Sequence, residues 1–132
     1  MTGEAARRQE RQRRFKLGLR GETLAALYLR AKGYRVLSRR FKTPVGEIDI
    51  VAARGRRLAF VEVKRRATFD AAANSVTPQA QRRMVRAAQY WLGRWPRYQD
   101  HDACFDVVLL APRRWPEHMT NAFGVPDGMW VG

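Results

Sequence analysis

The spacing of apolar residues predicts a helix followed by a strand in the first third of the chain. Between residues 18 and 32 apolar side chains recur at helical spacing, at Leu24, Leu27, Tyr28 and Ala31. Gly33 follows directly, and glycine is the residue type that most often ends a helix. Residues 34–41 are typical of a strand, which the sequence Lys-Thr-Pro at residues 42–44 interrupts.

The next two apolar runs predict a β-hairpin. Residues 45–53 read VGEIDIVAA and residues 58–65 read LAFVEVKR, and both runs are rich in strand-forming residues. Gly55 lies between them and suits a tight two-residue turn of type I′ or II′. The small residues that follow, from 68 to 76, predict a loop.

The second half of the chain predicts one more long helix and two more strands. Thr77 and Pro78 are favoured residue types for the N-cap and the first position of a helix. An apolar stripe continues to about residue 95, formed by Met84, Val85, Ala88, Trp91, Leu92 and Trp95. Residues 103–111 are typical of a buried strand, and residues 117–123 of a last short one.

The strongly basic charge of the chain indicates the kind of partner that it binds. The chain has 132 residues and a net charge of +14, and 22 of its 26 basic residues are arginine. Residues 1–14 contribute +3 and are expected to form a basic arm, disordered or loosely helical. Residues 15–132 are expected to form a single α/β domain, a mixed β-sheet flanked by α-helices. Because arginine suits phosphate, nucleic acid is the leading expected partner and an anionic membrane surface the second.

Other features exclude several classes of protein. The only cysteine is Cys104, which excludes a disulfide framework and a thiolate metal site. His101 and His118 lack the spacing of zinc ligands and are expected at the surface or in the tail, without a role in chemistry. The longest apolar run, residues 107–111, is too short to cross a membrane, and no signal peptide is evident. A reduced, cytoplasmic setting is therefore expected.

The register of the predicted hairpin brings acidic residues together. A turn centred on Gly55 and Arg56 gives the hairpin one aliphatic face and one charged face. On the aliphatic face, the opposed pairs are Ile50–Val61 and Ile48–Val63. On the other face, they are Val51–Phe60, Asp49–Glu62 and Glu47–Lys64. Opposed carboxylates destabilise a sheet by a few tenths to ~1 kcal/mol, which a bound Mg²⁺ or Mn²⁺ ion at Asp49 and Glu62 would explain. Lys64 would hold the attacking water or stabilise charge on a phosphate. The alternative is a solvated face of mixed charge.

The same residues also bear a family resemblance. The segment VGEIDIVAARGRRLAFVEVKRR, preceded by GETLAALYLRAKGYRVL, resembles the YraN family of uncharacterised bacterial proteins, over about residues 18–123. That family is similar to the archaeal Holliday-junction resolvases and to the wider PD-(D/E)XK nucleases. The resemblance implies a restriction-endonuclease-like fold and Mg²⁺-dependent hydrolysis of phosphodiester bonds, with branched or otherwise structured DNA as the expected substrate.

The resemblance also implies the residues of the site. Asp49 matches the aspartate of the motif, Glu62-Val63-Lys64 its E-x-K, and Glu22 the additional acidic residue of the resolvase-like members. The implied metal ligands are Asp49, Glu62, a backbone carbonyl near Val63, and Glu22. From the sequence pattern alone, Glu22 would be a carboxylate that favours the positive N-terminal end of its helix.

Three positions depart from the family pattern. Ala80 stands where many relatives have lysine, Cys104 where many have arginine, and Arg40 where many have asparagine. If those residues contact phosphate in relatives, other basic side chains must do so here. The candidates are Arg39, Arg40 and Lys42 near the active end, and Arg82, Arg83 and Arg86 on the second helix, where a solvated face is the alternative.

Several residues have a structural interpretation instead. Glu47 is expected to pair with Lys64 or to lie at the edge of the site. Asp106, in a buried strand, needs a partner, for which an arginine or a helix N-terminus is preferred. Trp91 and Trp95 are expected in the core. Two rival functions stay open, a nucleic-acid-binding module with little or no turnover and an assembly factor with an acidic partner; a homodimer is a further possibility.

Overall fold

A computed structural model describes residues 3–125 of the chain, without the side chains of residues 10–20. The elements in chain order are α1 (Gly3–Ala31), β1 (Arg35–Thr43), β2 (Gly46–Arg54), β3 (Arg57–Arg65), α2 (Phe69–Asn74), α3 (Pro78–Arg94), the short 3₁₀ helix η1 (Pro96–Tyr98), β4 (Asp102–Leu110) and β5 (Glu117–Phe123). The predicted mixed α/β architecture is therefore confirmed, and the strand at 117–123 has the predicted limits.

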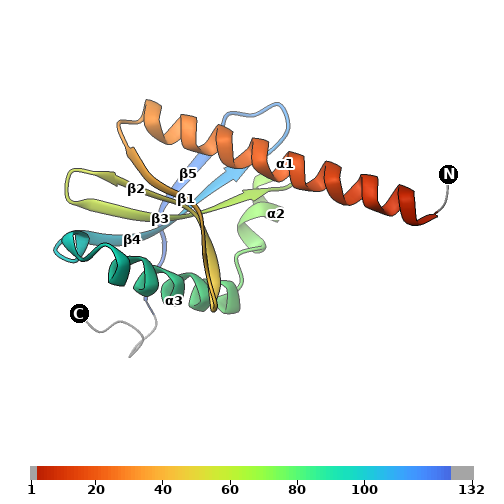
Figure 1. The fold of residues 1–132 in the computed structure, drawn as a ribbon. Coiled ribbons are helices and arrows are strands. Elements are labelled where there is room, and N and C mark those ends of the chain that lie inside the picture. Colours follow the sequence, from red (N-terminus) through yellow and green to blue (C-terminus); the bar gives the residue numbers. More distant parts are fainter. Residues whose placement is uncertain (1–2, 126–132) are drawn as a thin grey trace.

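The five strands form one mixed sheet in the order β1-β2-β3-β4-β5. Strands β1, β2 and β3 form an antiparallel meander, β3 and β4 are parallel, and β5 returns antiparallel to β4. The parallel pair requires a crossover, which α2 and α3 supply. Figure 1 shows α1 on one side of the sheet and α3 on the other.

Both faces of the sheet are buried, which corrects the expectation of a single aliphatic hairpin face. Val51 packs with Trp91 in the core cluster on the α3 side, whereas Ile50 packs with Leu29 in the cluster on the α1 side. Ile48, expected on the same face as Ile50, instead belongs to the α3 cluster. Because a helix covers each face, apolar residues on both sides of these strands find a core. The prediction that Trp91 lies in the core is confirmed, since it is 1% exposed.

Helix α1 is longer than the helix predicted over residues 18–32. It begins at Gly3 and has 29 residues, so that it includes most of the basic arm. The alanine, arginine, glutamate and glutamine residues of this part are all good helix formers, which favours the helical alternative for the arm. Figure 1 shows that the N-terminal half of α1 projects beyond the sheet.

The loop predicted over residues 68–76 is wrong, because it contains the six-residue helix α2. The signal for this helix is its N-cap, where the Thr68 hydroxyl accepts a hydrogen bond of 3.1 Å from the Ala71 N–H. The same device confirms the predicted start of α3. There the Thr77 hydroxyl accepts a hydrogen bond of 3.2 Å from the Ala80 N–H, and Pro78 is the first helical residue.

Candidate metal centre and nucleic-acid interface

The predicted hairpin register holds from the turn as far as the pair Ile50–Val61, and the β2–β3 pairing ends there. The expected ladder pair Asp49–Glu62 is therefore not formed. Strand β2 stays paired with β1 as far as Gly46. Residues 46–49 of β2 therefore follow β1 and separate from residues 62–65 of β3, which leaves a fork between the two strands. In the resulting fork, the Val63 N–H donates a hydrogen bond of 2.8 Å to Oδ2 of Asp49. The Asp49 side chain thus replaces the missing strand partner of β3.

The fork places Asp49 and Glu62 in a setting that disfavours negative charge. Burial and the negative charge of Glu62 raise the pKa of Asp49 to about 7, against the Val63 hydrogen bond, which lowers it. Burial also raises the pKa of Glu62, although Lys64 Nζ lies 3.2 Å from Glu62 Oε1 and opposes the shift. Two neighbouring carboxylates are therefore poorly solvated and mutually repulsive, which is the electrostatic condition that a cation relieves.

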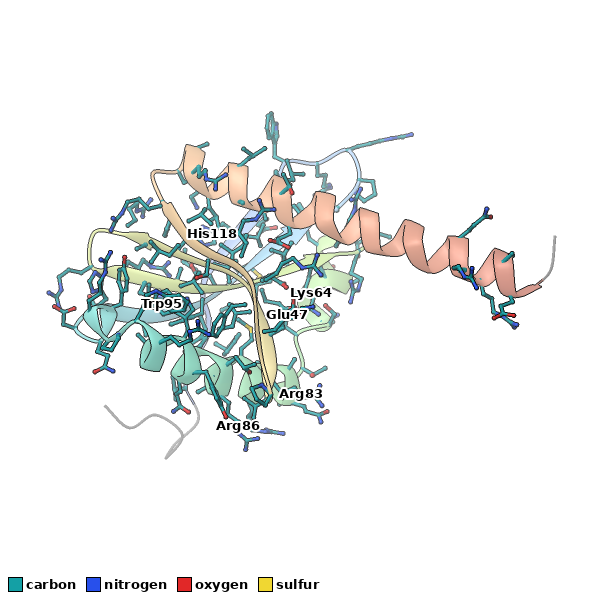
Figure 2. All side chains as sticks on the ribbon, in the orientation of Figure 1. Glu47, Lys64, Arg83, Arg86, Trp95 and His118 are labelled. Atoms are coloured by element: carbon teal, nitrogen blue, oxygen red, sulfur yellow. The ribbon has the colours of Figure 1, made fainter. Side chains whose placement is uncertain are left out.

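Glu47 lies at the edge of this group and does not form the expected ion pair with Lys64. Its carboxylate is 3.8 Å from the Arg40 guanidinium, while Lys64 pairs with Glu62. The negative charge of Glu47 nevertheless raises the pKa of both Asp49 and Glu62. In the view of Figure 2, Glu47 and Lys64 are both labelled in the region between α1 and α3. The ion pair of Glu47 with Lys64 is therefore not formed, and the placement of Glu47 at the edge of a site stays a prediction.

Glu22, in α1, is a third acidic residue that acts on the fork. It is 6% exposed, and its negative charge adds to the rise in the pKa of Asp49. Its oxygens lie 2.9 Å from the Arg39 guanidinium and 3.7 Å from that of Arg40. Because α1 begins at Gly3, Glu22 is far from the helix N-terminus, so the interpretation as a dipole partner is wrong. Its role as a metal ligand stays a prediction.

The donor set at the fork fits a hard divalent cation, although a complete ligand cluster is not assembled. Among the side chains described, those of residues 3–9 and 21–125, no group of three or more His, Cys, Asp and Glu is spaced to hold a metal ion. The available oxygens are the carboxylates of Asp49 and Glu62 and the carbonyl of Val63. The N–H and C=O of a strand residue point to the same neighbour, so this carbonyl also faces the fork. Oxygen donors of this kind suit Mg²⁺ or Mn²⁺.

The residues predicted to contact nucleic acid form two groups on either side of the β1–β2 connection. Arg39 and Arg40 lie at the fork, held by Glu22, and Lys42 is exposed further along β1. Arg82, Arg83 and Arg86 are exposed on α3, and Figure 2 shows Arg83 and Arg86 on its outer side. The two groups meet at Gly46, where a Cβ atom would lie only 3.1 Å from the Arg83 carbonyl oxygen. The connection therefore packs directly against the helix.

Arg40 has a strained backbone conformation, with φ at 53° in the left-handed region. Asparagine adopts this region much more readily than other residues with a Cβ. We therefore expect Arg40→Asn to be more stable than Arg40→Ala by about 1 kcal/mol, because both lose the ion pairs but only alanine retains the strain. Urea unfolding of the two variants tests this; equal stability would contradict it.

A buried ionic cluster on the α1 side of the sheet was only partly predicted. Asp106 is fully buried, and Arg57 donates two hydrogen bonds of 2.6 and 2.7 Å to its carboxylate, which confirms the expected arginine partner. His118 Nε2 donates a third of 2.7 Å and the Asn121 N–H a fourth of 2.9 Å. Burial alone would raise the pKa of Asp106, but these hydrogen bonds lower it to about 2.

The expectation of a surface position for His118 is wrong. Its side chain is 1% exposed, and its Nδ1 accepts a hydrogen bond of 2.6 Å from Lys32 Nζ at the end of α1. The cluster thus joins α1, β3, β4 and β5. Burial lowers the pKa of Lys32, and the positive charge of Arg54 lowers it further. Local sequence gives no signal for His118, because its partners are distant along the chain; the buried acid at Asp106 was the available clue.

The part of the chain that holds the fork and the ionic cluster is also the part that matches a known protein family. The model of the uncharacterised protein family UPF0102 matches residues 21–110, which include the fork and the ionic residues Arg57 and Asp106. In the described part of the chain, no helix has an apolar stretch long enough to cross a membrane.

Three similar proteins bear the name UPF0102 protein. That of Parvibaculum lavamentivorans is 60% identical over 109 residues, which cover 83% of this chain and 82% of the relative. That of Rhodopseudomonas palustris strain HaA2 is 55% identical, over 83% of this chain and 85% of its own. That of Chelativorans sp. strain BNC1 is 50% identical over 119 residues, 90% of this chain and 96% of its own. The chain therefore belongs to the uncharacterised protein family UPF0102.

Proposed function

We propose that this protein is a metal-dependent endonuclease of restriction-endonuclease-like fold that hydrolyses phosphodiester bonds in DNA. The observation on which the proposal rests is the pair of adjacent carboxylates at the fork, Asp49 and Glu62, both with raised pKa values and with Lys64 beside them. An ordinary hairpin gains nothing from this arrangement, because it costs stability without a cation. A bound cation would offset that cost.

In this proposal Asp49, Glu62 and the Val63 carbonyl hold Mg²⁺ or Mn²⁺, with Glu22 as the further predicted ligand. The ion would polarise a phosphate oxygen and lower the pKa of a water molecule. The Val63 N–H keeps the Asp49 carboxylate in place through its 2.8 Å hydrogen bond. Lys64, which is already anchored by Glu62, orients the attacking water and stabilises the charge that develops on the phosphate.

The basic surface supplies the binding of DNA. Arg39 and Arg40 are positioned by Glu22 at the fork, and the exposed residues Lys42, Arg82, Arg83 and Arg86 extend the positive surface along the β1–β2 connection and α3. Phosphate contacts of this kind give affinity but little sequence preference. The substrate is therefore defined by its backbone and shape more than by its bases. A cytoplasmic setting and a homodimer stay predictions.

The Lys64→Ala variant tests the catalytic part of the proposal. We expect cleavage at saturating DNA with Mn²⁺ to slow by about a hundredfold or more, because a positioned donor to the reacting phosphate is lost. DNA affinity should fall only slightly, since one positive charge among many is removed from binding. Single-turnover cleavage rates and equilibrium binding in chelator measure the two effects separately.

The matched control is Arg35→Ala, which removes one exposed positive charge at the opposite end of β1. It should leave the cleavage rate at saturating DNA at the wild-type value. If Lys64→Ala lowered affinity and rate by equal factors, Lys64 would be a plain phosphate contact and its catalytic role would be wrong.

A second function is favoured by the ion pairs of the site itself. Lys64 lies against Glu62, and Arg39 and Arg40 lie against Glu22, so the chain's own cations already compensate two of the acidic residues. A nucleic-acid-binding module with the same fold would need only this compensation and no metal. Salt-sensitive DNA binding without cleavage in Mg²⁺ or Mn²⁺ would support the module over the endonuclease.

A further inference from the structure

The loop between β4 and β5, residues 111–116, presents a tryptophan to solvent. Trp115 is 88% exposed, more than any other large apolar side chain of the described residues. The loop is nevertheless anchored on both sides of it. Pro116 is buried, and the Arg114 guanidinium lies 5.4 Å from the centre of the Phe69 ring in α2. The indole is therefore held out from a fixed loop.

The register of the sheet places this loop near the fork. Lys64 of β3 is aligned with Leu109 of β4, which is aligned with Glu117 of β5. These three residues form a row across the sheet at the strand spacing of about 4.8 Å, and Trp115 lies two residues beyond its end. Its Cα is thus at most about 17 Å from that of Lys64, which corresponds to about five base steps of a DNA strand at 3.4 Å each.

A backbone hydrogen bond joins β3 and β4 at the end of the sheet where this loop begins. The Arg66 N–H donates a hydrogen bond of 3.1 Å to the Leu110 carbonyl, so β3 and β4 end together. Two arginines, Arg113 and Arg114, precede Trp115 in the loop and both are exposed. An exposed aromatic ring in a loop that also carries exposed arginines is a combination that binds unpaired nucleotides, with the base stacked and the phosphate paired.

We propose that Trp115 stacks on an unpaired base of the DNA substrate within a few nucleotides of the cleavage site, with Arg113 contacting the neighbouring phosphate. The inference rests on the proposed function and specifies its substrate class, which is duplex DNA that continues into a single strand. A base inside an intact duplex is already stacked on its neighbours and gains nothing from the indole. The loop therefore selects for unpaired nucleotides within a few steps of the scissile bond.

The surroundings of the loop favour this partner over a lipid surface. Among the side chains that the structure describes, the other exposed large apolar ones, Leu24, Leu27 and Tyr90, lie on α1 and α3, so that the loop offers a single aromatic ring to insert. Two acids, Asp70 and Glu117, and one cation, Arg114, line the cavity of about 370 Å³ between the loop and α2. An extended anionic membrane surface laid across the loop would meet both acids, whereas a single stacked base and the one phosphate held by Arg113 need not contact them.

The test compares two DNA ligands in chelator, a blunt duplex and the same duplex with a single-stranded extension. We expect Trp115→Ala to lose about 5- to 100-fold in affinity for the extended duplex, and less than about twofold for the blunt one. Trp115→Phe, which keeps an aromatic face, should recover most of the loss. Leu27→Ala, an equally simple truncation of a side chain that is 55% exposed, should change neither affinity.

Equal losses on both ligands, or no loss on the extended duplex, would overturn the inference. So would Trp115-dependent binding to phosphatidylserine vesicles with unchanged DNA affinity. Cleavage of the extended duplex in Mn²⁺ by the wild-type protein, compared with a reaction in chelator, tests the proposed function by itself. If the wild-type protein cleaves but the two ligands respond alike to Trp115→Ala, the endonuclease stands and the stacking site fails. If the ligands respond differently and no cleavage occurs, the stacking site stands and the endonuclease fails.

Discussion

At pH 8 and without metal, Asp49→Asn should unfold at a higher temperature than the wild-type protein, and the difference should shrink as the pH is lowered to 5. The pKa of Asp49 is raised to about 7 in the folded protein, against about 4 in the unfolded chain. The folded state therefore binds more protons in this window, and its stability falls as pH rises, by up to about 1.4 kcal/mol per pH unit. Asparagine is neutral throughout and keeps an oxygen for the Val63 N–H.

Metal should reverse the order of the two proteins. Mn²⁺ at pH 8 is expected to stabilise wild type by preferential binding, about 2.7 kcal/mol at one hundred times the dissociation constant, and to stabilise Asp49→Asn much less. The variant should also lose more than about a hundredfold in cleavage rate. Thermal melts in chelator and in Mn²⁺ measure the stability, with Asp102→Asn, which changes an exposed carboxylate, as the control. An equal shift with Mn²⁺ in wild type and Asp49→Asn would contradict a metal site at the fork.

Arg57→Leu should destabilise the protein by about 3–5 kcal/mol. The substitution removes two hydrogen bonds from Asp106 and leaves its carboxylate charged and fully buried.

The depressed pKa of Asp106, about 2, makes the stability of the folded protein depend on pH. Its contribution to stability is present above about pH 4 and is lost as the pH falls towards 2.

A double-mutant cycle separates the charge from the shape of Arg57. In an Asp106→Asn background the same Arg57→Leu change should cost much less, because no buried charge is left without its partner. Urea unfolding at pH 7 gives the four free energies. Equal costs of Arg57→Leu in both backgrounds would mean that the arginine stabilises the fold by packing alone.

The hairpin and its turn could be predicted from the sequence because alternation and Gly55 are local signals. The point at which the hairpin opens could not, since it depends on β2 staying paired with β1 beyond Ile50. The same limit applies to His118, whose contact with Lys32 joins residues 86 positions apart. Only the family resemblance placed Glu22 near the site, because its position near the start of the predicted helix suggests a different role. Local pattern thus located the acidic pair, and tertiary contacts decided what surrounds each acid.

The parallel pairing of β3 with β4 also sets an order for folding. The meander β1–β2–β3 closes through short connections, whereas β4 can join β3 only after the 36 residues between them, Arg66 to His101, have folded into the crossover. Until then β3 is an open edge strand with Phe60 and Val61 unburied on opposite faces. An unprotected apolar edge recruits other chains, so the refolding yield should fall steeply with protein concentration during this step.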